Sequence, residues 1–238
     1  MSFYNDLTAI KQVLFQHKNL IKAEKQLAAL AKHCQSDSDM HAVQELLALV
    51  YRQQKNFSRA STVYQKLDNP LLAGYCQLLN GKLSAAANFW RPPCEIYPKH
   101  WVVTLYAMIT RQLNQYPTLL QIRNNLEVDV CNLVEAKRFE YLENIYYYLP
   151  TLSYLNLEAY KMCGRALLNT NQLDRVESFL MLGQKALPSD PETYYHLGQY
   201  YYRLENYKES LLMLKQCLLI MPNYYPAAVL TNKVKEIA

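Results

Sequence analysis

The chain has 238 residues and a net charge of +5, and 51% of its residues are hydrophobic. This length allows one or two domains, and the hydrophobic fraction excludes a disordered chain. Only 5 glycines occur, too few for a fold built on tight β-turns or phosphate-binding loops. Tyrosine occurs 21 times, and its apolar ring with a polar tip suits half-buried faces and interfaces.

The sequence shows no targeting or membrane signal. Its first residues contain no basic patch followed by an apolar run, so we expect no signal peptide. No stretch approaches about 18 uncharged apolar residues, so we expect no membrane span. The six cysteines are scattered without a C-x-x-C pair, which indicates reduced, mostly buried thiols. Together these features predict a cytoplasmic protein.

The N-terminal block, residues 1–100, contains three faint helix pairs. In 4–36 and in 41–70, apolar residues recur at helical spacing. The third pair, 67–100, overlaps the second, so the second helix of 41–70 must be short. It must end before Pro70, because proline lacks an N–H group and breaks a helix.

The connection between the first two pairs contains His33, Cys34, Asp37 and His41, which are residue types that can bind zinc. The stretch between them is polar and rich in serine and aspartate, which favour helix N-caps. We therefore predict an exposed inter-helix loop here, with no metal or other cofactor.

The middle block, residues 101–156, lacks the repeated spacing that the C-terminal block contains. Residues 117–136 predict one long helix with an apolar face. A second helix begins at Phe139, ahead of Pro150. No repeat spacing is evident, so the block is either a diverged pair of repeat helices or an elbow between two repeat blocks.

The C-terminal block, residues 157–238, contains an internal repeat, in which the pattern of 157–190 returns in 191–224. Nine positions share the same offset. They are Tyr160 and Tyr194, Cys163 and Leu197, Gly164 and Gly198, Leu167 and Tyr201, Leu173 and Tyr207, Val176 and Ser210, Leu180 and Leu214, Gly183 and Cys217, and Pro188 and Pro222.

The spacing within each repeat predicts two antiparallel helices. The first four positions fall at i, i+3, i+4 and i+7, on one helix face, and the next four form a second such face. Only the short turn 204–206 separates them, so the helices must pack against each other. The small Gly198 and Ser210 fall where the two backbones approach most closely, and Pro222 ends the second helix. Residues from Tyr224 to Ala238 predict a polar capping helix.

Residues 191–224 place an aromatic residue, then Leu-Gly, a Tyr, a small residue and a final Pro in an order that resembles the tetratricopeptide repeat. The resemblance is also good in 157–190, and it recurs more faintly in 4–36, 41–70 and 67–100, so residues 1–100 are expected to form N-terminal repeats of the same kind. The resemblance implies an all-α superhelix of about 12–14 antiparallel helices. It also implies a scaffold or adaptor that holds a partner protein or peptide in the concave groove lined by the first helix of each pair. The sequence contains none of the common catalytic motifs, so we expect no enzyme and no small-molecule substrate.

In that groove, side chains off the packing face would meet the partner. Basic groups bind carboxylates, and tyrosines add contact area that can donate hydrogen bonds. These residue types predict a partner segment that is acidic or carries a free C-terminal carboxylate. The predicted partner-binding residues are Lys161, Arg165, Tyr195, His196, Gln199, Tyr202 and Arg203.

This set is similar to part of the carboxylate clamp of some tetratricopeptide co-chaperones, with two departures. His196 takes the place of one clamp asparagine, and Pro226 and Leu230 stand where cations would be needed. Two alternative functions stay open. The chain could be a helical-repeat RNA-binding protein, although its groove positions vary in type and its second half is not basic. It could also be a chaperone for a secreted or assembled partner.

Overall fold

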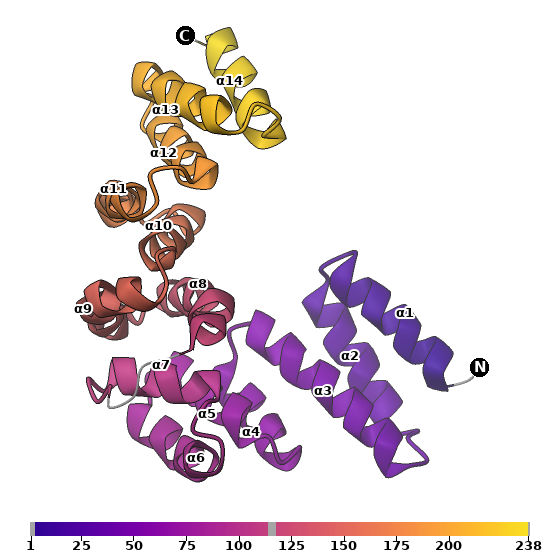
Figure 1. The fold of residues 1–238 in the computed structure, drawn as a ribbon. Coiled ribbons are helices and arrows are strands. Elements are labelled where there is room, and N and C mark those ends of the chain that lie inside the picture. Colours follow the sequence, from indigo (N-terminus) through magenta and orange to yellow (C-terminus); the bar gives the residue numbers. More distant parts are fainter. Residues whose placement is uncertain (1–2, 114–117, 238) are drawn as a thin grey trace. The chain divides into compact units, whose positions relative to one another are not determined.

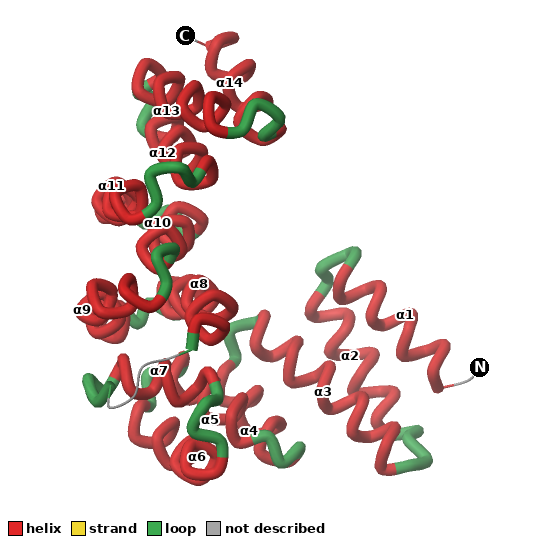
Figure 2. The backbone as a smooth tube through the Cα atoms, viewed as in Figure 1, coloured by secondary structure: helices red, strands yellow, loops and turns green. Residues whose placement is uncertain are grey.

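The computed structural model describes residues 3–113 and 118–237. All regular structure in these residues is helical, with fourteen α-helices and one short 3₁₀ helix (Figures 1 and 2). The expectation of an all-α superhelix of antiparallel helices is therefore confirmed in its helix content and number. None of the described helices is both long and apolar enough to cross a lipid bilayer. The predicted segments also include residues 1, 2, 114–117 and 238, which lie outside the described residues.

The helices form two compact units, Met1–Pro98 and Lys99–Ala238. In the first unit each helix packs on the one before it. Its helices are α1 (Phe3–Phe15), α2 (Leu20–Ala31), α3 (Asp37–Gln53), α4 (Phe57–Lys66), α5 (Pro70–Leu79) and α6 (Leu83–Ile96).

Two local features of the first unit match their sequence signals. The short helix expected before Pro70 is α4, and Asp68 makes the turn with a φ of 50°. The polar stretch between His33 and His41 is a loop only as far as Ser36, because α3 already begins at Asp37. The predicted N-cap is Ser36, whose hydroxyl accepts a hydrogen bond from the Asp39 N–H at 3.1 Å. Within the described residues, no three His, Cys, Asp or Glu side chains gather as a metal site would require.

The six cysteines are free thiols, three of them buried and three half-buried. Burial raises the pKa of Cys76 to about 12, and that of Cys131 and of Cys217 to about 11. These thiols therefore stay protonated near neutral pH and behave as small apolar groups.

The second unit contains two rows of helices. Helices α8, α10, α12 and α14 form one row, each in contact with the next, and α9, α11 and α13 form the other (Figure 1). The unit consists of α7 (Trp101–Ile109), α8 (Leu119–Glu135), α9 (Phe139–Leu155), α10 (Ala159–Asn169), a 3₁₀ turn (Leu173–Arg175), α11 (Val176–Ala186), α12 (Pro191–Arg203), α13 (Tyr207–Ile220) and α14 (Tyr225–Ile237).

The spacing of the C-terminal repeats continues into the middle block. Lys137, Asn171 and Glu205 have positive φ angles in the turns that follow α8, α10 and α12, each one repeat period after the last. The long helix predicted over 117–136 is α8, and α9 continues past Pro150. Of the two alternatives for the middle block, the turn spacing favours a diverged pair of repeat helices for α8 and α9.

The turn between α12 and α13 shows how tightly the pairs are joined. Glu205 donates its N–H to the Tyr202 carbonyl at 3.1 Å, and Asn206 donates to the Tyr201 carbonyl at 2.9 Å. This pattern is a Schellman ending of α12. The Asn206 side chain then accepts the Glu209 N–H at 3.3 Å and caps α13. Asn206 thus takes part in both the end of α12 and the start of α13, which confirms the short turn predicted at 204–206.

The two helices of a pair meet at a glycine. A Cβ atom on Gly198 would lie 2.8 Å from the Leu214 side chain, and one on Gly164 would lie 2.7 Å from Leu180. The Ser210 hydroxyl donates to the Gly198 carbonyl at 2.8 Å, so the backbones are in close contact. This arrangement confirms that the small residues mark the closest approach of the paired helices.

Replacing either glycine by alanine should therefore destabilise the second unit. We expect Gly198→Ala and Gly164→Ala each to lower the free energy of unfolding by about 1–3 kcal/mol, because the new methyl group overpacks a buried leucine. Urea unfolding followed by circular dichroism measures the change. Lys215→Ala, on the exposed side of α13, is the control and should stay within about 0.5 kcal/mol of wild type. Unchanged unfolding midpoints in both glycine variants would contradict this packing.

Candidate functional site

The seven residues predicted to contact a partner all lie on α10 and α12, in the row of first helices. The structure divides them into two neighbouring groups. One is an ion cluster that joins α8, α10 and α12, and the other lines an open hollow between α12 and α14.

Lys161 lies inside the ion cluster. The residue is only 3% exposed, and its Nζ lies 2.8 Å from Glu192 Oε2, 3.0 Å from Asp190 Oδ2 and 3.4 Å from Glu158 Oε1. The expectation that Lys161 is an exposed charge in the groove is therefore wrong. A buried ammonium group needs such partners, because removing it from water without them is costly.

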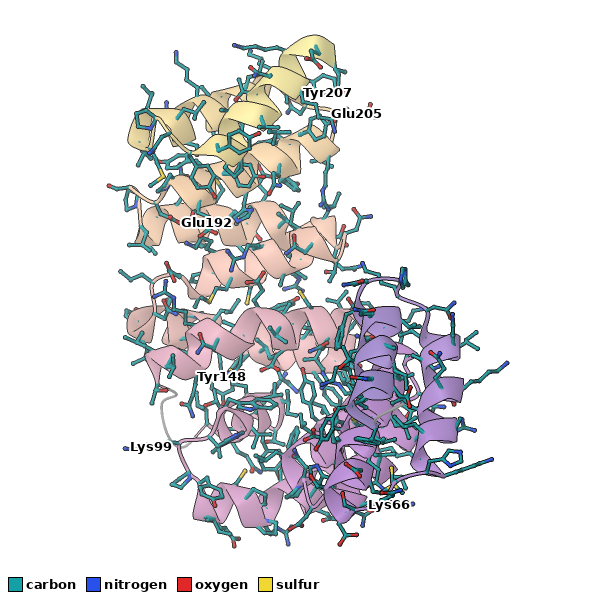
Figure 3. The ribbon with its side chains drawn as sticks, turned by 90° about the vertical axis from the view of Figure 1, so that its right-hand side faces the viewer. Lys66, Lys99, Tyr148, Glu192, Glu205 and Tyr207 are labelled. Atoms are coloured by element: carbon teal, nitrogen blue, oxygen red, sulfur yellow. The ribbon has the colours of Figure 1, made fainter. Side chains whose placement is uncertain are left out.

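Arg165 makes its contacts within the chain as well. Its guanidinium binds both carboxylate oxygens of Glu127 on α8, with Nε 2.9 Å from Oε1. Its Nη1 donates to Glu192 Oε1 at 2.6 Å. Glu192 therefore bridges both cations of α10. It lies in the first turn of α12, where Figure 3 labels it. The expectation that Arg165 is free for a partner's carboxylate does not fit this bidentate pairing.

The repeat explains why these groups meet. Glu127, on α8, precedes Lys161 by one repeat period, and Glu158 precedes Glu192 by the same interval. Asp190 is placed by its role as the N-cap of α12, where it accepts the Thr193 N–H at 3.2 Å. Sequence reasoning missed Glu127 because α8 was not recognised as a repeat helix. Its offset of one repeat period from Lys161 was the available signal.

The cluster carries a net negative charge. Lys161 and Arg165 face four carboxylates, and the exposed Arg123 approaches only Glu158, at 3.8 Å. The Lys161 side chain is 4% exposed, whereas that of Glu192 is 32% exposed. The Arg165 side chain is 26% exposed, close to the 24% of Glu127, so the excess of carboxylates rather than their exposure makes the cluster unfavourable for a partner's carboxylate.

The charges in the cluster shift one another's titration. Burial alone would lower the pKa of Lys161, but hydrogen bonds to Glu192 and Asp190 outweigh it and raise that pKa above its ordinary value. The adjoining His196 ring and then Lys161 and Arg165 hold the pKa of Glu192 well below its ordinary 4.5, against the opposing effect of burial.

His196 connects the cluster to the hollow. The residue is buried, and its Nε2 lies 3.8 Å from Glu192 Oε1. On the other side, its Nδ1 lies 2.8 Å from the Gln199 side-chain oxygen, and the Gln199 amide donates to the Tyr195 hydroxyl at 2.9 Å. Tyr195 and Gln199 are thus held in place from the cluster side.

The hollow between α12 and α14 has a volume of about 480 Å³ and opens to solvent. It brings together four of the seven predicted residues. From α12 it is lined by Tyr195, Gln199, Tyr202 and Arg203, and from α14 by Tyr225, Pro226, Val229, Leu230 and Lys233.

Sequence reasoning placed Pro226 and Leu230 of α14 at groove positions but not among the partner-binding residues, and it missed Lys233 because it took that helix for a polar cap. The sequence signal for this cation was helical spacing, because Lys233 lies one turn beyond Leu230 and so faces the same hollow. The Lys233 ammonium lies over the Tyr202 ring, 5.1 Å from its centroid. Arg203 is exposed and donates one N–H to the Leu168 carbonyl on α10. No acidic residue is among the described residues that line the hollow.

The low pKa of Glu192 predicts a specific acid dependence. A carboxylate whose pKa is lowered in the folded state stabilises the fold at pH values above its ordinary pKa of 4.5. This contribution is lost as the pH falls below 4.5. We expect Glu192→Gln to be less stable than wild type at pH 7 by about 1–3 kcal/mol. The difference should shrink as the pH falls below 4.5.

Urea unfolding at a series of pH values measures this dependence. Glu236→Gln, at an exposed site near the end of α14, is the matched control and should leave the profile unchanged. If Glu192→Gln and wild type had the same free energy of unfolding at every pH, the cluster would not stabilise the fold.

Comparison with known proteins agrees with the repeat. Residues 191–224 match the family model of the tetratricopeptide repeat. No curated protein matches the sequence of the chain.

Two solved structures are similar to the chain. One is a chain from the crystal structure of the APC/C hetero-tetramer Cut9–Hcn1, 12% identical with a TM-score of 0.41. The match covers 98% of this chain and 42% of that one. The other is a tetratricopeptide repeat protein from Parabacteroides merdae, 14% identical with a TM-score of 0.43, and the match covers 98% and 99% of the two chains. The α12–α13 hairpin, whose first helix lines one side of the hollow, is the segment of the chain that matches the tetratricopeptide repeat model.

Proposed function

We propose that this protein is a scaffold or adaptor that holds a segment of a partner protein in the hollow between α12 and α14. The observation that carries the proposal is the lining of the hollow, which combines tyrosines and aliphatic groups with two exposed cations and no acidic residue among those described. We include in the proposal that the protein acts in the cytoplasm and catalyses no reaction itself.

A peptide fits this hollow better than a small molecule does. The hollow is open to solvent, whereas small-molecule sites bury most of their ligand. Tyr195, Tyr202 and Tyr225 offer broad contact at a low cost in side-chain entropy. Tyr225 is 76% exposed and Val229 is 48% exposed, so both can pack against an apolar side chain of the partner.

The charge of the hollow favours an acidic residue or a terminal carboxylate in that segment. Arg203 uses one of its five N–H donors within the chain. The Lys233 ammonium group is exposed beside the Tyr202 ring. A carboxylate bound here would accept charge-assisted hydrogen bonds from either cation. The cluster around Lys161 is net negative, so the acidic part of the segment should lie at the α14 side.

The seven predicted residues take two roles in this proposal. Those that line the hollow contact the partner directly, while the buried or half-buried groups hold α12 in place beside α8 and α10. The direct contacts are Tyr195, Gln199, Tyr202 and Arg203, and the positioning residues are Lys161, Arg165 and His196.

Selection of phage-displayed random peptides on the purified protein tests the proposal. We expect enriched peptides to carry a large apolar residue next to Asp, Glu or the C-terminus. The Arg203→Glu/Lys233→Glu variant should bind them at least about tenfold more weakly, because charge-assisted hydrogen bonds contribute about 1.5–3 kcal/mol each. Val229→Asp should have a similar effect by placing a carboxylate in the hollow.

The matched control is Lys208→Glu/Lys215→Glu, which reverses two exposed lysines of α13 outside the hollow. It should bind the selected peptides like wild type. Circular dichroism and unfolding curves check that each variant is folded. Selection of basic peptides, or equal binding by the hollow variants and wild type, would refute this site.

A further inference from the structure

The turn between α1 and α2 exposes two large apolar side chains. Phe15, the last residue of α1, is 54% exposed, and Ile21, in the first turn of α2, is 67% exposed. Residues 16–19 join them in a short loop (Figure 1). A single exposed apolar residue needs no explanation, but two at one hairpin tip mark a candidate contact surface.

Lysines surround these two side chains. Lys18 lies in the loop with a φ of 49°, and Lys22 follows Ile21 directly. Lys11 lies one turn before Phe15 on α1, and Lys25 lies one turn after Ile21 on α2. All four are exposed, and none forms a salt bridge with another part of the described chain. The tip therefore presents uncompensated positive charge around an apolar centre.

The nearest acidic residues do not neutralise the tip. Asp6 lies in the first turn of α1, at the opposite end of that helix. Glu24 accepts a hydrogen bond from the Gln54 side chain at 2.8 Å and lies 3.7 Å from Arg59. Its charge is thus engaged by groups outside the α1–α2 hairpin.

The chemistry of the tip distinguishes between kinds of anionic partner. The hollow between α1 and α2 lies at the other end of the hairpin, beside Asp6 and His33, and not at Phe15 and Ile21. Of these two apolar side chains only Phe15 is aromatic, and the aliphatic Ile21 cannot stack on a nucleobase. All cations of the tip are lysines, and the first arginine of the chain is Arg52, so the forked donors that suit defined phosphates are missing here.

We propose that the α1–α2 tip is a peripheral contact to the surface of an anionic lipid bilayer. Lysines at a bilayer act as diffuse charges attracted to acidic headgroups, and their methylene stems tolerate the interface. Phe15 and Ile21 enter the boundary between headgroups and acyl chains, where burying apolar surface adds to the electrostatic attraction. The contact is a reversible association of a hairpin tip and requires no membrane-spanning helix.

Co-sedimentation of the full chain with vesicles tests this proposal. Wild type should bind vesicles of phosphatidylcholine with about 30% phosphatidylserine, and should not bind phosphatidylcholine alone. Binding should weaken as salt rises from about 0.1 M to about 0.5 M, because the lysines are exposed. Phe15→Ser/Ile21→Ser and Lys18→Glu/Lys22→Glu should each lower the partition coefficient by about tenfold or more.

The controls are Leu212→Ser/Leu219→Ser and Lys208→Glu/Lys215→Glu. They make the same changes at exposed leucines and lysines of α13, on a helix side rather than a hairpin tip. They should bind the vesicles like wild type, and circular dichroism confirms the fold of each variant. Failure of wild type to bind anionic vesicles would overturn the proposal. So would tip variants that bind as well as wild type, or α13 variants that lose binding to the same extent.

Discussion

The close approach of paired helices over a small residue is the constraint on which the rest of the structure depends. In three pairs, a large side chain of the second helix covers a glycine of the first, at the same sequence offset each time. Trp90 covers Gly74, Leu180 covers Gly164, and Leu214 covers Gly198. A helix pair held this tightly can meet its neighbour only along its remaining faces. In the second unit, that packing places α8, α10, α12 and α14 side by side and so creates a common face.

The charged side chains on this face determine which kind of partner it can bind. Lys161 is so deeply buried that it requires carboxylates, and the chain supplies them from the starts of α10 and α12. Breaking up such a set leaves charges without partners, so it fixes the register of the helices whatever its net effect on stability. The cluster leaves Arg203 and Lys233 at the other end as the cations available to a ligand. In the proposed function, the structural charges and the ligand-binding charges are thus separated along one helix row.

The fold was largely predictable from sequence where the repeat keeps its small residues. Gly164 and Gly198 identify the last two pairs at once. The preceding pair has Val130 at that position, buried between its helices, and Tyr154 where the later repeats have Pro188 and Pro222. Without a glycine and a terminal proline, the apolar frame of α8 and α9 looks like any pair of amphipathic helices.

The site was less predictable, because helical spacing indicates which face a residue occupies but not which groups meet it there. Lys161 and Arg165 do lie on the face shared by the first helices. Their partners Glu127 and Glu192 come from two other helices, one of them in a segment not recognised as a repeat. The depth of Lys161 depends on those contacts, which no single helix pattern contains.

Residue-resolved lysine acetylation separates the structural role of Lys161 from the proposed ligand contact of Lys233. The native protein is treated briefly with an acetylating reagent, with and without a selected peptide, and each lysine is quantified by mass spectrometry. The account predicts that Lys161 stays unmodified in both samples, since its ammonium group is buried among carboxylates. Lys233 should react freely and become protected by the peptide, while Lys215 should react equally in both samples. Rapid modification of Lys161, or protection of Lys161 rather than Lys233 by the peptide, would contradict the account.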